Sequence, residues 1–179
     1  MADRWLLLIY TIPAQPSRKR ATVWREVKKA GAIYLRDGVC ILPERPPQLR
    51  AFEEIAAKVF ELGGRATLVR SALVDGERAE AVIAEAAAAR DAEYEDILRE
   101  IDRFRAHLQR EREHREFTFG ELQELEADVG KLQRWSAQVQ GRDFTAVGKA
   151  AEVDEALARC EAELAAFADE TYEQEHRES

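Results

Sequence analysis

The residues best suited to chemistry in this chain are cations gathered between positions 18 and 29. They are Arg18, Lys19, Arg20, Arg25, Lys28 and Lys29. On a helix turning about 100° per residue, Arg18, Thr22, Arg25 and Lys29 follow one side, with Lys28 beside them. Lys19 and Arg20 would stand at the helix start, where backbone N–H groups also attract anions. Such a row predicts contact with nucleic-acid phosphates or capture of a small oxyanion. An ordinary solvated helix surface is the alternative interpretation.

The charge of the chain is divided unevenly along its length. The 179 residues carry a net charge of −8. Residues 1–74 hold 13 Lys and Arg against 7 Asp and Glu, a net of +6, and residues 75–179 hold 14 against 28, a net of −14. This asymmetry predicts two domains, 1–74 and 75–179, of which the first meets an anion.

The elements that must position the cations belong to a small α/β domain. Apolar runs predict strands, and the first of them should be central or covered on both faces. Ser17 is the expected N-cap of the cationic helix, Gly31 its C-cap, and Asp37-Gly38 a hairpin turn. The predicted order is strand 4–12, helix 18–30, strands 32–35 and 39–42, helix 49–62 and strand 66–73. This β-α-β-β-α-β order is the ferredoxin-like arrangement.

The acidic half is predicted to form three helices. Each has a row of apolar residues along one face, called a seam below. Asp75 should cap a helix that runs to about Arg115, and Thr118-x-x-Glu121 is a capping box that starts the second helix. Gly141 should end the second helix, and a tail from Glu170 should fray. The seams consist of Tyr94, Ile97, Leu98, Ile101, Phe104 and Leu108, then Leu122, Leu125, Val129, Leu132, Trp135 and Val139, then Val153, Leu157, Cys160, Leu164 and Phe167. Short connections between such seams predict an antiparallel three-helix bundle or coiled coil.

No residue set with the spacing of a catalytic, cofactor or metal site stands out. Glu111-x-x-His114 resembles half of a di-iron motif, but the second half and further inward glutamates are missing. Cys40 and Cys160 lie on apolar faces and are expected to be inert core thiols. We therefore predict a protein that is not an enzyme and holds neither cofactor nor metal. No run of about 18 apolar residues exists and the N-terminus lacks a signal-peptide pattern, so a cytoplasmic protein without membrane contact is expected.

Several short motifs in the basic half recur in a known family. They are Trp5-Leu-Leu-Leu-Ile-Tyr-Thr-Ile-Pro13, Pro16-Ser-Arg-Lys-Arg20, Val23-Trp-Arg25, Lys28-Lys-Ala-Gly31-Ala and Asp37-Gly-Val-Cys-Ile-Leu-Pro43. In this order and spacing they resemble the N-terminal domain of the ChrB family of chromate-resistance regulators. A more distant likeness links this half to PaaX-type repressors and small CRISPR-associated nucleases. Those nucleases carry an aspartate where this chain has Tyr10-Thr11, so phosphodiester cleavage is not expected.

The resemblance implies a bacterial transcriptional regulator of chromate efflux, with chromate as effector. Full-length family members carry a further C-terminal domain, which this sequence does not contain. Our first hypothesis is DNA binding through the basic helix, whose cations would contact phosphates without reading bases. The second is a non-catalytic interaction module that works as a homodimer or with a separately encoded C-terminal-domain partner. The third is direct binding of chromate at the helix start.

Overall fold

The computed structural model describes residues 4–114, 117–145 and 148–178. The fold is of the α+β class, with a four-stranded antiparallel sheet and five helices in this described part. The chain forms two compact units, one of residues 1–88 with 142–145 and one of residues 89–141 with 146–179. Within the described residues, no helix is long and apolar enough to cross a membrane.

The sheet of the first unit has the strand order β2-β3-β1-β4. Strand β1 (Trp5–Thr11) pairs with both β3 (Val39–Pro43) and β4 (Arg65–Ser71), so Leu8 lies opposite Cys40 and Leu68. Strand β2 (Ile33–Arg36) closes the edge beside β3. The apolar run at the N-terminus is therefore central, as its sequence predicts.

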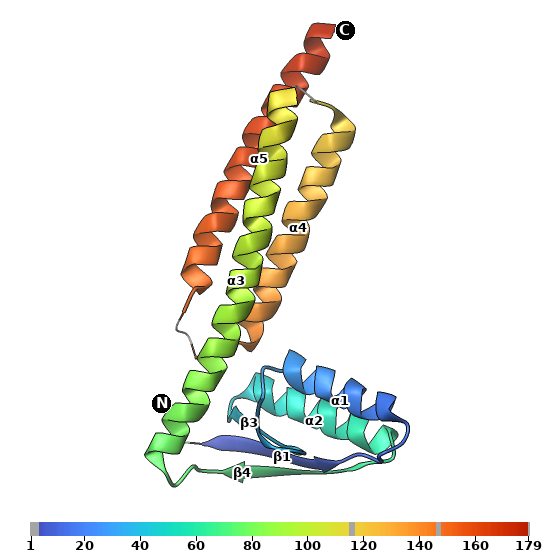
Figure 1. Ribbon diagram of the computed structural model, residues 1–179, viewed down its shortest axis with the longest axis vertical. Helices are drawn as coiled ribbons and strands as arrows, with labels where there is room; N and C mark the ends of the chain where they lie inside the picture. The colour runs from blue at the N-terminus through green and yellow to red at the C-terminus, as the bar shows by residue number, and fades with distance from the viewer. Residues whose placement is uncertain (1–3, 115–116, 146–147, 179) are drawn as a thin grey trace. The chain divides into compact units, whose positions relative to one another are not determined.

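Helices α1 (Ser17–Lys29) and α2 (Pro46–Glu61) cover one face of the sheet (Figure 1). Side chains alternate between the two faces along β1, so Leu6 and Leu8 share one of them. Both leucines are buried, and so are Val23 and Val27 of α1. Helix α2 contributes three further buried residues, Phe52, Ile55 and Val59. Each large apolar side chain buried in this way contributes about 1.5–3 kcal/mol, which fixes α1 on a firm support.

The first turns of helix α3 (Gly76–His114) also belong to this unit. Val82 and Ala86 join the same hydrophobic core, together with Phe144 from the connection after α4. Phe144 meets Trp5 edge to face with ring centroids 6.5 Å apart. The unit thus reaches beyond residue 74, because these apolar side chains complete its core.

The turn between β2 and β3 depends on glycine. Gly38 has φ +72°, and its carbonyl accepts a 2.7 Å hydrogen bond from the N–H of Tyr10. A Cβ at this position would lie 2.5 Å from the carbonyl oxygen of Tyr10, closer than such atoms can approach. The Asp37-Gly38 hairpin predicted from sequence is confirmed, and it brings the turn against the end of β1.

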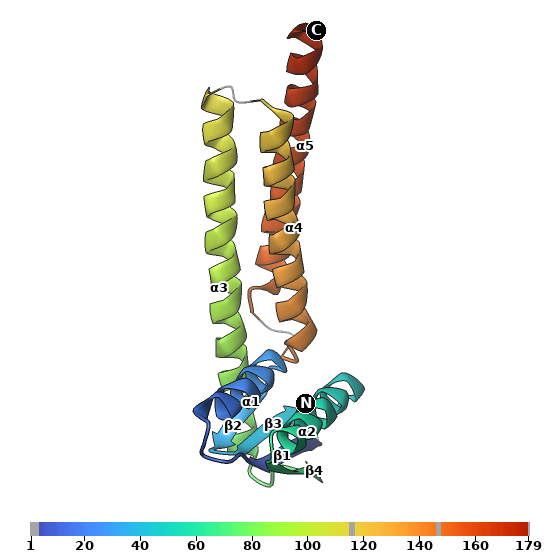
Figure 2. The same cartoon turned by 90° about the vertical axis from the view of Figure 1, so that its right-hand side faces the viewer.

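The second unit consists of α3 after residue 88, α4 (Phe119–Arg142) and α5 (Ala150–Glu178), which run alongside one another (Figures 1 and 2). The predicted seams form one shared core in which Tyr94, Leu125, Cys160 and Phe167 are fully buried. Leu98, Trp135 and Leu164 lie at its margin and are only partly buried. The spacing of apolar residues therefore identified the packed faces correctly.

Two of the predicted helix caps are confirmed. Asp75 Oδ1 accepts hydrogen bonds from the N–H groups of Glu77 and Arg78, at 3.0 and 3.4 Å. Thr118 Oγ1 accepts one from Glu121 N at 3.2 Å. The prediction for Ser17 was wrong. Ser17 is already the first residue of α1, follows Pro16, and makes no capping bond with its side chain.

Three other expectations need correction. Helix α2 begins at Pro46 rather than Leu49, because proline fits the first turn of a helix, where its missing N–H costs nothing. Phe60 is 57% exposed, although a large apolar residue in the predicted helix 49–62 is expected to face the core. Helix α5 continues through the tail to Glu178, and the buried Thr171 donates a 2.9 Å hydrogen bond to the carbonyl of Phe167. Core contact therefore holds the tail further along than its charge indicated.

Candidate nucleic-acid interface

Helix α1 presents most of its cations to solvent. Val23 and Val27 take up the face that meets the sheet, so the charged residues between them point outward. Lys19 is half-buried, and the other predicted site residues are exposed: Arg18, Arg20, Arg25, Lys28 and Lys29. The amphipathic pattern of the sequence therefore placed these five side chains on the surface correctly.

Lys19 differs from the others because it takes part in the fold. Its Nζ donates a 2.9 Å hydrogen bond to the carbonyl of Leu62, the residue after the end of α2. A cation at a helix C-terminus satisfies a free carbonyl and interacts well with the helix dipole. Lys19 thus joins α1 to α2 and has fewer free N–H groups for an outside anion than the sequence indicated.

The exposed cations of α1 make little use of the protein's own carboxylates. Within residues 4–114, 117–145 and 148–178, no carboxylate lies within ion-pair distance of any of the five. Arg25 instead lies along its own helix, with Nε donating to the carbonyl of Ala21 at 3.3 Å and Nη2 to Thr22 Oγ1 at 3.5 Å. Five positive groups are therefore held on a supported helix without a described counter-ion.

The cationic row is not uniform along its length. Lys29 lines a groove of about 310 Å³ between α1 and α2 together with Glu26, Glu54 and Lys58. The two carboxylates lower the positive potential at this end of the row. The helical projection could not show this, because Glu54 and Lys58 come from another helix.

A second groove, of about 500 Å³, lies at the opposite side of α1. Arg20 and Trp24, one turn apart, line it together with Tyr10, Tyr34 and Asp37. The hydroxyl oxygens of Tyr10 and Tyr34 are 2.7 Å apart. Burial raises the pKa of both phenols, and their mutual hydrogen bond adds to the rise for Tyr34. Both therefore stay neutral at physiological pH. Because one hydroxyl donates to the other, one O–H remains for an outside partner, while Asp37 opposes a close anion.

Trp24 is the residue of this groove that the sequence analysis missed. It follows the buried Val23 in the sequence, yet it is 52% exposed. Its spacing of four residues from Arg20 was the available signal, since residues at i and i+4 are neighbours on a helix. A guanidinium beside an exposed indole can contact phosphate and stack on a base or sugar.

The comparison with known proteins settles the family. The family described as "Protein ChrB, N-terminal" matches residues 20–178 of the chain. The chain belongs to the ChrB N-terminal family. The resemblance carried by the motifs between Trp5 and Pro43 is thus confirmed, and the matched range includes α1 from Arg20 onward.

A curated relative agrees with this assignment. The Protein ChrB of Cupriavidus metallidurans strain CH34 is 30% identical over 74 residues. The matched stretch is 41% of this chain and 23% of the relative. The matched stretch therefore spans less than a quarter of that relative's length.

Proposed function

We propose that this ChrB-family chain binds DNA through α1 and acts as a transcriptional regulator in chromate resistance. The observation that carries the proposal is the row of exposed α1 cations for which the described residues supply no carboxylate partner. Like charges on a protein surface repel one another, and a bound polyanion reduces this repulsion. This function places the chain in the cytoplasm and involves no catalytic step.

The contacts are expected to be electrostatic and to position the protein on the duplex. Arg18, Arg25, Lys28 and Lys29 would contact phosphates, because they are exposed on one helix. Each neutralised phosphate steepens the dependence of log affinity on log salt by about 0.9 for duplex DNA. Phosphate contacts carry no sequence information by themselves. Trp24 and Arg20, at the second groove, are the side chains placed to add contacts with sugars or bases.

The test is a paired charge reversal measured by fluorescence anisotropy on duplex DNA from upstream of the chain's own gene. The variant Arg25→Glu/Lys29→Glu should bind at least about 100-fold more weakly, since two attractive contacts become repulsive. Arg99→Glu/Arg103→Glu is the matched control, because both arginines are exposed but each already pairs with a carboxylate in its own helix. The control should bind within about twofold of the parent. Equal binding by the α1 variant and the parent would refute the DNA surface.

A non-catalytic interaction module is the second candidate function. Two large aromatic side chains, Trp24 of α1 and Phe60 of α2, are more than half exposed. Exposed aromatic residues are enriched at protein interfaces. If the chain pairs with itself or with a separate C-terminal-domain partner through these helices, Trp24→Ser/Phe60→Ser should abolish the larger species in sedimentation. Failure of the parent to retain any duplex at low salt would favour this candidate over DNA binding.

Chromate is proposed as the effector, with the groove beside Arg20 as its binding place. Arg20 supplies a guanidinium, and the pair of neutral phenols supplies one free O–H donor. Calorimetry with chromate and with sulfate tests the proposal, and Arg20→Gln should abolish any preference for chromate. Equal heats for both anions, or none, would remove chromate binding from the assignment.

A finer description of the architecture is also proposed. The order β2-β3-β1-β4 with antiparallel neighbours supports a ferredoxin-like N-terminal unit. The core shared by α3, α4 and α5 supports an antiparallel three-helix bundle.

A further inference from the structure

Three side chains with metal-binding chemistry meet in the second unit. His107 and Glu111 lie one turn apart on α3, and Glu121 lies in the first turn of α4. His107 Nε2 is 3.2 Å from Glu111 Oε1 and 3.3 Å from Glu121 Oε1. One ligand atom from each residue lies within 4.8 Å of the others. The sequence had paired Glu111 with His114 instead, so this grouping emerges only from the packing of α3 against α4.

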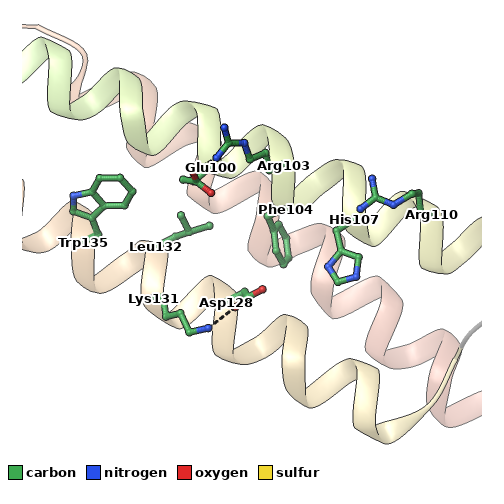
Figure 3. Close-up of a pocket in the computed structure, with 9 residues that line it drawn as sticks. All are labelled: Glu100, Arg103, Phe104, His107, Arg110, Asp128, Lys131, Leu132 and Trp135. Carbon is green, nitrogen blue, oxygen red and sulfur yellow. Dashed lines mark hydrogen bonds and ion pairs between the residues drawn. The ribbon is translucent and has the colours of Figure 1, made fainter.

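The fold fixes each of the three donors. Phe104 and Leu108, buried on α3 on either side of His107, hold this face of the helix against the core. Leu122 is buried next to Glu121 and holds the start of α4 in the same way. The hydrogen bond from Glu121 N to Thr118 Oγ1 sets the first turn from which the carboxylate projects. Figure 3 shows His107 projecting from α3 toward α4.

The buried carboxylate of Glu111 is incompletely satisfied by the described residues. Two carboxylates share one imidazole nitrogen, and that nitrogen carries at most one proton to donate. Glu111 is only 12% exposed in its side chain, and its Oε2 is buried without a hydrogen bond from any described residue. An unsatisfied buried carboxylate oxygen is costly. Two nearby cations already have carboxylate partners, since Arg112 pairs with Glu170 and Lys131 with Asp128.

We propose that His107, Glu111 and Glu121 bind a divalent first-row transition metal ion of the Zn²⁺ type. Zinc bonds of about 2.0–2.2 Å at tetrahedral angles place neighbouring ligand atoms roughly 3.3–3.6 Å apart, close to the two observed separations. One imidazole with two carboxylates suits Zn²⁺ or Mn²⁺ and does not suit soft ions such as Cu(I). The three residues leave a coordination position for solvent.

The site has an entry path and a structural consequence. His107 is 29% exposed and lines a groove of about 530 Å³ between α3 and α4. Figure 3 shows the His107 side chain among the residues that line this groove. Because the ligands come from both helices, the ion ties the end of α3 to the start of α4. Binding to the folded state alone stabilises that state as the metal concentration rises.

The two thiols of the chain do not compete for the ion. Burial raises the pKa of Cys40 to about 12 and that of Cys160 to about 11. Only the thiolate is a good metal ligand, so both sulfurs stay protonated and inert at neutral pH. His114 is exposed on the same helix outside the cluster and serves as the natural control.

The test uses the full chain without an affinity tag and calorimetric titration with Zn²⁺. One ion should bind per chain, and Co²⁺ should give visible d–d absorption of a site with nitrogen and oxygen ligands. His107→Gln and Glu121→Gln should each lower Zn²⁺ affinity by about 100-fold or more, since loss of even an outer partner costs 10–100-fold. His114→Gln should stay within twofold of the parent. Melting temperature should rise with Zn²⁺ in the parent and not in His107→Gln.

Three outcomes would overturn the site. They are the absence of saturable Zn²⁺ binding, unchanged affinity in both variants, and an equal response to Mg²⁺, which would indicate general attraction by carboxylates. Circular dichroism first establishes that each variant is folded. If His107→Gln loses its helical signal, Glu111→Gln takes its place, because it keeps the side-chain shape and removes only the anionic ligand. None of these measurements involves DNA binding, so they test the metal site independently of the proposed function.

Discussion

The cations of α1 in the first unit and several arginines of the second unit differ in whether a carboxylate pairs with them. On α1, Arg18, Arg20 and Lys28 are exposed and no described carboxylate pairs with them. In the second unit, several arginines are matched with acids. Arg99 pairs with Asp96, Arg103 with Glu100, Arg105 with Glu163 and Arg112 with Glu170.

The difference separates charge used within the fold from charge available to a partner. Arg105 and Arg112 reach from α3 to carboxylates of α5, so they bind one helix to another. The cations of α1 have no such internal role, apart from the bond of Lys19 to Leu62. Carboxylates of the acidic helical unit therefore pair with several of its own arginines, whereas no described carboxylate pairs with the exposed cations of α1.

The largest effect should come from removing the support beneath α1 and α2. Phe52 is fully buried in the core of the first unit. Phe52→Ala should lower the free energy of unfolding by about 3–5 kcal/mol through lost burial and a residual cavity. Phe60→Ala on the same helix is the control, because this exposed ring should cost under about 0.5 kcal/mol. Urea denaturation measures both, and equal losses would contradict the assignment of the core face.

Salt should then distinguish the two charged surfaces. If five α1 cations contact phosphate, raising salt from about 50 to 200 mM should weaken DNA binding by roughly 10²–10³-fold. Arg18→Gln/Arg25→Gln should reduce the slope of log affinity against log salt by about 1.8. Arg99→Gln/Arg103→Gln should leave the slope unchanged. A common slope for all three proteins would show that α1 is not the contacting surface.

A smaller effect is expected within the second unit. Arg105 Nε donates to both carboxylate oxygens of Glu163, at 3.1 and 2.9 Å. Because the pair is partly exposed, Arg105→Gln should cost about 1 kcal/mol of unfolding free energy. Arg103→Gln, which breaks a pair within one helix, should cost about 0.3 kcal/mol. A double-mutant cycle with Glu163→Gln measures the coupling, and a value near zero would remove the interhelical role of Arg105.

The smallest effect concerns pH. The hydrogen bond from Arg105 holds the pKa of Glu163 below its ordinary value. A depressed folded-state pKa adds stability above the ordinary glutamate pKa of about 4.3, and this stability is lost as pH falls through the lower folded value. From pH 6 to pH 3, the parent should therefore lose more unfolding free energy than Arg105→Gln does. The difference between the two losses should be under about 1 kcal/mol. Identical pH profiles would exclude a protonation-linked pair.

Local patterns predicted much of the fold because short-range rules control those features. The alternation and length of the run at Trp5, the Asp37-Gly38 turn and the caps at Asp75 and Thr118 each depend on a few neighbouring residues. Predictions failed where a distant segment intervened. The contact of Phe144, in the connection after α4, with Trp5 was not predicted, and Thr171 is buried in a tail expected to fray.

The candidate sites also contain some residues that local patterns predicted and others that they did not. Periodicity alone put Arg18, Arg25 and Lys28 on an outward face, because a helix with one apolar side must expose the other. It could not supply Glu54 beside Lys29, the phenols beside Arg20 or Glu121 beside His107, since those partners come from other elements.

The amino-acid sequence by itself determined the family, the basic first helix and the apolar seams of the acidic half, because composition and periodic spacing are local properties. Tertiary structure alone decided which cations keep no described partner and which carboxylates gather around His107. Those outcomes depend on contacts between side chains of different helices and strands. The distance between two residues along the chain does not show whether they are in contact in the fold.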